Sequence, residues 1–225
     1  ELGCDLRAAK PGQVMERVVH VPLLNGLANY LYDMLEKEAH MVKLDGLQII
    51  RTAVPAPTIS SSELLHILLR DAPQHLYPHK LTHFAGSRLA DVLSGKSDGI
   101  KVIFGSEEGR NLASGLYADS PLNKLSYAQI QDFLKRLVSR LPADGNPLKI
   151  LELGAGTGGT TKWIVPLLAG LGIPVEYCFS DLAPSFVAAA RKRFGKEYSF
   201  MKFQTVDVEK DPPAELINSQ HVVLA

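Results

Sequence analysis

The chain has 225 residues, of which 46% are hydrophobic, and its 24 basic residues balance its 24 acidic residues. This length allows one large or two small domains, and the balanced charge disfavours nucleic-acid binding, which usually needs a basic face. Two cysteines, Cys4 and Cys178, cannot build a disulfide framework. Since no signal peptide or membrane-length apolar stretch is recognised, the sequence predicts a cytoplasmic protein without a membrane partner.

Residues 1–145 predict a mainly helical N-terminal subdomain. Apolar spacing and capping residues indicate helices at 22–42, after the serines at 60–62, and at 82–93, 106–117 and 124–141. Asp45-Gly46 indicates a turn, and the β-prone segment 47–53 after it predicts a small hairpin. Pro142 and the cluster at 144–147 mark a boundary before a different kind of sequence.

Three histidines in this part, His75, His79 and His83, are spaced four residues apart. On a helix that spacing is compatible with metal ligation. We expect Pro78 to interrupt the helix, and no cysteine or acidic cluster accompanies the histidines. Local structural roles are therefore favoured, and no metal site is predicted.

Residues 146–225 predict an α/β subdomain that opens with LKILELGAGTGGTT, at 148–161. An apolar strand leads into Gly154, Ala155, Gly156 and Gly158, where glycines allow a sharp turn and close approach to a ligand. The spacing of the glycines, continued to residue 159, also satisfies the dinucleotide fingerprint, so a dehydrogenase is an alternative. Glu152, two residues before the first glycine, resembles the acid in motif I of class I S-adenosyl-L-methionine (SAM) methyltransferases. That resemblance implies recognition of the SAM ammonium, directly or through water.

Further apolar segments at 175–180, 200–206 and 221–225 predict three more strands. Asp181 ends the first of these, where it can accept hydrogen bonds from ribose hydroxyls or cap the following helix. Asp207 follows the next, and in class I methyltransferases an acid there meets the adenine amino group. The predicted cofactor site also includes the neighbours Leu182 and Val208.

The stretch 86–123, with LADVLSGK and FGSEEG, adds a more specific resemblance. Together with RTAVPAP at 51–57, FSDLAPSFVAAARKRF and the closing HVVLA, it resembles the C-methyltransferase domain of fungal iterative type I polyketide synthases, closer to the non-reducing ones. The expected fold is the N-terminal half of a class I methyltransferase (Rossmann-like) sheet, preceded by a helical lid. The two predicted parts are therefore a lid or substrate subdomain, 1–145, and a truncated SAM-binding subdomain, 146–225.

This resemblance implies SAM-dependent methylation of the α carbon of a β-ketoacyl thioester, with S-adenosyl-L-homocysteine as product. The substrate would be tethered to the phosphopantetheine of an acyl carrier protein, and neighbouring synthase domains would be further partners. The family's catalytic base lies after the fourth strand, beyond Ala225, so no catalytic residue is assigned. Tyr117, in a segment that closes over the SAM pocket in this family, is a candidate; alternatively it only packs helix against sheet.

Two other functions remain open on the sequence. A pseudo-methyltransferase that serves as a folded spacer would be expected to show damaged glycines, and none are damaged here. A stand-alone O- or N-methyltransferase for small molecules is disfavoured by the motifs between residues 86 and 123.

Overall fold

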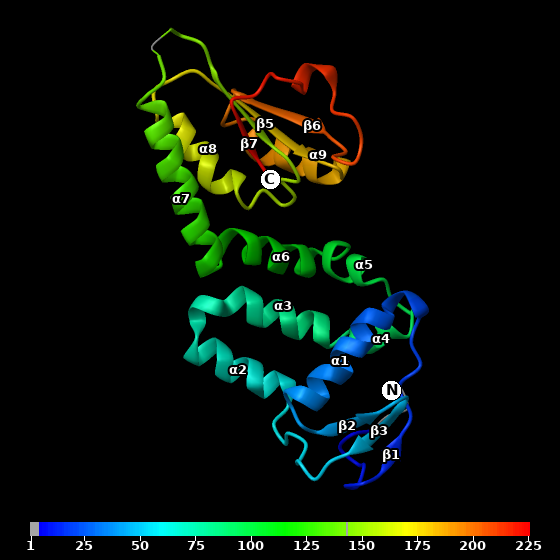
Figure 1. Ribbon diagram of the computed structural model, residues 1–225. Coiled ribbons are helices and arrows are strands. Elements are labelled where there is room, and N and C mark those ends of the chain that lie inside the picture. The colour runs from blue at the N-terminus through cyan, green and yellow to red at the C-terminus, as the bar shows by residue number, and fades with distance from the viewer. Residues whose placement is uncertain (1–4, 143) are drawn as a thin grey trace. The chain divides into compact units, whose positions relative to one another are not determined.

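The computed structural model describes residues 5–142 and 144–225, so Cys4 lies outside the described residues (Figure 1). The chain divides into two compact units, Glu1–Gly109 and Arg110–Ala225. The predicted boundary at 145 and 146 marks the linker into the parallel sheet, whereas the packing boundary lies earlier, at Gly109. Residues 110–142 therefore pack in the same unit as the sheet. In the described ranges, no helix has the length and apolar character needed to cross a membrane.

The first unit combines a small antiparallel sheet with helices. The sheet has the order β1-β3-β2, from strands β1 (Val14–Met15), β2 (Val42–Asp45) and β3 (Gln48–Arg51). Its helical segments are η1 (Pro22–Leu24), α1 (Asn25–Lys37), α2 (Ser61–Asp71), η2 (Pro73–His75), α3 (Leu76–Gly86), α4 (Leu89–Leu93) and α5 (Gly99–Phe104), with α6 (Glu107–Asp119) leading into the second unit. The hairpin expected around Asp45-Gly46 is present, with Gly46 at φ 58°; β1 was not predicted.

Two predicted helices of this unit differ from those observed. The helix expected over 82–93 is divided into α3 and α4, because Ser87 and Arg88 side chains both donate to the carbonyl of Phe84, at 3.0 and 2.8 Å. The helix expected to reach residue 42 ends at Lys37, and His40, with φ 52°, turns the chain into β2. Pro78 does not interrupt its helix: it lies in the first turn of α3, where no backbone donor is needed.

The second unit is a four-stranded parallel sheet with the order β6-β5-β4-β7. Its elements after α6 are α7 (Pro121–Val138), β4 (Leu148–Glu152), α8 (Thr161–Ala169), β5 (Val175–Asp181), α9 (Pro184–Phe194), β6 (Met201–Thr205), η3 (Ala214–Leu216) and β7 (Val222–Leu224). All four predicted strands are present. The strand order reverses between β4 and β7, and ligands of such sheets bind beyond the carboxyl ends of the strands at that point.

The core of this unit lies between the sheet and its helices. Ile150 and Phe179 of the sheet are fully buried, as are Ile164 of α8 and Leu134 of α7. Because Leu134 belongs to this core, α7 packs with the parallel sheet.

Candidate cofactor site at the carboxyl end of the parallel sheet

The loop between β4 and α8 has the backbone that its glycines permit. Gly154, Gly156 and Gly158 have φ values of 64°, 55° and 76°, in the left-handed region that side chains disfavour. The Ala155 N–H donates to the carbonyl of Ser180, at 2.9 Å, which ties the loop to the end of β5. The predicted tight turn that depends on glycine is thus confirmed, and it lies beside the end of β5.

Asp181 connects this loop to the start of α9. Its Oδ2 accepts the Gly156 N–H at 2.8 Å and its Oδ1 accepts the Ala183 N–H at 2.8 Å, while the residue is only 9% exposed. Ala183, not Asp181, is the N-cap of α9, so a simple capping role is not what the structure shows. Each carboxylate oxygen keeps acceptor capacity for a further donor.

Glu152, the last residue of β4, is 3% exposed. Its Oε2 accepts hydrogen bonds from the Thr161 hydroxyl at 2.6 Å and the Tyr177 hydroxyl at 2.7 Å. Burial raises the pKa of Glu152 to about 6, against the lowering effect of those hydrogen bonds, and the nearby Asp181 raises it further. Thr161 and Tyr177 were not predicted as site residues; a hydroxyl directly after the glycine loop was the only local sign.

The third acidic position, Asp207, follows β6 at the same edge of the sheet. Lys210 lies 3.1 Å from its carboxylate and lowers its pKa, and the Glu209 N–H donates to Oδ1 at 3.1 Å. The apolar neighbours Leu182 and Val208 are 63% and 67% exposed. Because β5 and β6 are paired in parallel, with Asp181 opposite Thr205, both aspartates and their apolar neighbours lie at the carboxyl ends of adjacent strands.

Tyr117 lies against the glycine loop from the end of α6. A Cβ added to Gly159 would be 3.1 Å from the Cβ of Tyr117, a tight contact that a larger residue could make only if Tyr117 moved. The Tyr117 carbonyl accepts the Tyr127 hydroxyl at 2.5 Å, and the side chain itself is 49% exposed. The indole of Trp163 donates to the carbonyl of Ala118 at 2.7 Å, which connects the end of α6 to α8.

These residues suit a ligand with the chemistry of SAM. The hydroxyl oxygen of Thr157, inside the glycine loop, is buried and has no hydrogen-bond partner among the described residues, and a buried polar group of this kind indicates a missing ligand or water. Apart from its two chain neighbours, no residue in the described part of the chain comes within 4 Å of a Cβ built on Gly154, so the loop leaves open space beside that residue. Buried Glu152 and Asp181 and the exposed Leu182 and Val208 lie near this loop at the same edge of the sheet.

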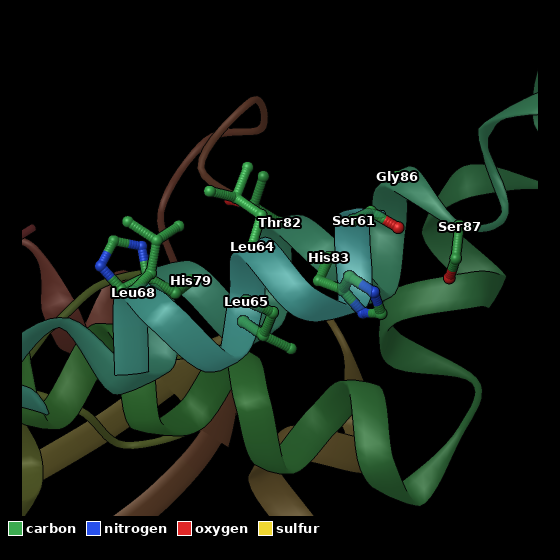
Figure 2. A pocket seen from close by; sticks show the side chains of 9 residues that line it. All are labelled: Ser61, Leu64, Leu65, Leu68, His79, Thr82, His83, Gly86 and Ser87. Atoms are coloured by element: carbon green, nitrogen blue, oxygen red, sulfur yellow. The ribbon is translucent and has the colours of Figure 1, made fainter. Parts of the chain in front are cut away.

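A separate pocket of about 410 Å³ lies between α2 and α3 (Figure 2). Leucines of α2, among them Leu64 and Leu68, line it together with His79 and His83 of α3. The His79 ring packs edge-on against that of His75, with centroids 5.9 Å apart. Across the described ranges, no group of three or more histidine, cysteine, aspartate or glutamate residues has a geometry suited to a metal ion.

Comparisons with known proteins identify close relatives. Non-reducing polyketide synthase pigA of Monascus ruber is 61% identical over 225 residues, covering 100% of this chain and 8% of that protein. Non-reducing polyketide synthase pks11 of Talaromyces marneffei is 59% identical, covering 100% of this chain and 9% of its own length. The chain thus spans less than a tenth of these curated relatives. No family model matches it.

Solved structures agree with these relatives. The CMeT domain of the citrinin polyketide synthase matches with a TM-score of 0.93 and 48% identity, over 99% of this chain and 58% of that one. The CurJ carbon methyltransferase matches with a TM-score of 0.74 and 26% identity, over 91% of this chain and 54% of that one. The fold is therefore that of a class I SAM methyltransferase, and the chain belongs to the C-methyltransferase domains of fungal non-reducing polyketide synthases.

Proposed function

We propose that the domain containing this chain transfers a methyl group from SAM to the α carbon of a β-ketoacyl thioester carried on the phosphopantetheine of an acyl carrier protein. The observation that carries the proposal is the glycine loop with Glu152 and Asp181 at its two sides, in a chain that is 48% identical to a polyketide synthase CMeT domain. We place the reaction in the cytoplasm, where the buried free thiol of Cys178 would stay reduced.

The residues of the site divide the parts of SAM among them. We expect Glu152 to bind the ammonium, directly or through water, and Asp181 to bind the ribose hydroxyls. One carboxylate oxygen of Asp181 accepts a backbone N–H of the glycine loop, and the other accepts the N–H of the residue before α9. Asp207 would accept the adenine amino group, with Leu182 and Val208 against the base. Gly154, Ala155, Gly156 and Gly158 form the loop around the amino-acid part.

The substrate carbon lies between two carbonyl groups, so its proton is acidic and its carbanion is stabilised as an enolate. When bound, SAM would supply the electrophilic methyl group, and breaking its C–S bond would release S-adenosyl-L-homocysteine. Transfer then needs a general base with a pKa near neutrality and a site that aligns the two carbons. We assign no general base among the described residues and place it after the fourth strand.

Tyr117 remains a candidate for binding the SAM carboxylate, since its half-exposed side chain lies beside the loop.

The test is methyl transfer by the complete domain to a β-ketoacyl thioester loaded on its carrier protein. We expect mass spectrometry to show one added methylene unit, located on the α carbon by fragmentation. Asp181→Ala should lose most of this product, whereas Asp211→Ala, at an exposed acid outside the site, should keep it. A folded parent that binds no SAM would indicate a structural spacer, and methylation on oxygen would contradict the assigned reaction.

A further inference from the structure

Three buried side chains from three separate elements meet at the base of the glycine loop. Glu152 ends β4, Thr161 begins α8 and Tyr177 lies in β5. Both hydroxyls donate to the same carboxylate oxygen, Oε2, at 2.6 and 2.7 Å, and both residues are fully buried. Since Glu152 and Thr161 stand at the two ends of the loop, their hydrogen bond closes it.

This arrangement is poorly explained as a device for stability alone. A buried carboxylate is unfavourable unless it is paired, and apolar side chains of similar volume usually pack there at lower free energy. Here the partners are two neutral hydroxyls and the backbone N–H of Thr161, all of which are uncharged. Two hydroxyls aimed at one oxygen favour the charged form of the carboxylate and hold its plane fixed.

We propose that Tyr177 and Thr161 are positioning residues that keep the Glu152 carboxylate charged and oriented toward the ammonium of SAM. This inference rests on the proposed function, because it assigns the two hydroxyls a role in SAM affinity through Glu152. We assign neither residue a direct contact with SAM. Their removal should change how SAM affinity depends on pH, which loss of packing alone would not do.

The surroundings of Glu152 define which groups take part in this titration. From β5, Tyr177 and Asp181 act on it, and from α7 Tyr127 is close enough to be affected by its charge. Burial raises the pKa of the Tyr177 hydroxyl well above its usual value, so it stays a donor. The neighbouring strand β7 is apolar, Val222–Leu224, and Lys162 of α8 is paired with Asp119.

The experiment measures the dissociation constant of SAM for the complete domain between pH 5 and 7. The ammonium of SAM stays protonated over this range, since α-amino groups titrate near 8. In the parent we expect affinity to fall as the pH falls through the pKa of Glu152, near 6. Tyr177→Phe and Thr161→Val should move the midpoint of that fall upward by about one pH unit, because each removes a hydrogen bond to the charged form.

Matched variants separate positioning from packing. Thr161→Ser keeps the hydroxyl and should retain the parental midpoint, Tyr198→Phe removes a hydroxyl elsewhere and should do the same, and Glu152→Gln should remove the pH dependence. Midpoints for Tyr177→Phe and Thr161→Val equal to that of the parent would overturn the inference while leaving SAM binding intact. A folded parent that binds no SAM at any pH would overturn the proposed function, and this inference with it.

Discussion

Among single residues, Glu152 is unusual because its carboxylate is buried, and burial disfavours its charged form. Its pKa is raised from 4.5 to about 6, mainly by burial. A carboxyl group whose folded pKa lies above its unfolded value stabilises the fold at low pH, and that contribution is lost as the pH rises through the folded pKa. Each pKa unit corresponds to about 1.4 kcal/mol, so the charged group opposes folding by about 2 kcal/mol at neutral pH.

Glu152→Gln should therefore gain stability relative to the parent as the pH rises. We expect the difference in free energy of unfolding between variant and parent to shift by up to about 2 kcal/mol in favour of the variant between pH 4.5 and 7.5. Denaturant unfolding of the complete domain at several pH values measures this difference. A difference that does not change with pH would show that Glu152 titrates normally.

The acidic residues of the site were predictable from the sequence, but their partners were not. The sequence places Glu152 and Asp181 at the ends of two apolar strands, and they are the last residues of β4 and β5. Tyr177 was read only as part of an apolar strand. Its role depends on the pairing of β5 with β4, which places Tyr177 opposite Ile150 and two residues from Glu152. The register of β5 against β4 depends on contacts between segments that are distant in the chain, so the sequence near Tyr177 does not predict it.

At the scale of elements, helix ends were predicted well where side chains cap them. Ser60 and Glu63 form a reciprocal capping box at the start of α2, as the serine run indicated. The break between α3 and α4 was missed, because Ser87 and Arg88 bind the Phe84 carbonyl through side chains rather than through a recognisable breaker. Local sequence patterns therefore predicted the helices. The boundary between α3 and α4 depends instead on side-chain hydrogen bonds to the Phe84 carbonyl.

Ser60→Ala should lower the free energy of unfolding by about 1 kcal/mol, because it leaves the Glu63 N–H without its capping acceptor. Thermal and denaturant unfolding of the complete domain measure this loss. The neighbouring Ser61→Ala is the control, since Ser61 lies one residue further along the same exposed helix start. Equal losses in the two variants would contradict the capping role of Ser60.

The contact between α6 and the glycine loop depends on Gly159. Gly159→Ala should destabilise the complete domain by about 1–3 kcal/mol, because the new Cβ lies 3.1 Å from Tyr117 and 3.3 Å from the Tyr127 hydroxyl. Gly170→Ala is the control, since its Cβ would have ordinary contacts, the nearest at 3.5 Å. Unfolding free energies that are unchanged for Gly159→Ala would show that α6 can move away without loss.

At the scale of the whole molecule, the sequence predicted the parallel sheet and its strands to within about one residue. It did not predict that α6 and α7 belong with that sheet. Their attachment depends on Trp163, Gln131 and Leu134, residues whose partners are distant in the chain or lie in another element. A linker rich in turn residues was visible locally, whereas the packing boundary at Gly109 was not.

The proposed function requires that the carboxyl end of this sheet binds SAM. Calorimetric titration of the complete domain with SAM measures this binding, beside the variants Gly156→Arg and Asp181→Ala and the control Asp211→Ala. We expect binding by the parent and the control, weaker binding by Asp181→Ala, and none by Gly156→Arg, since a side chain at φ 55° would distort the loop. A folded parent without SAM binding, or undiminished binding by Gly156→Arg, would show that the glycine loop is not a SAM site.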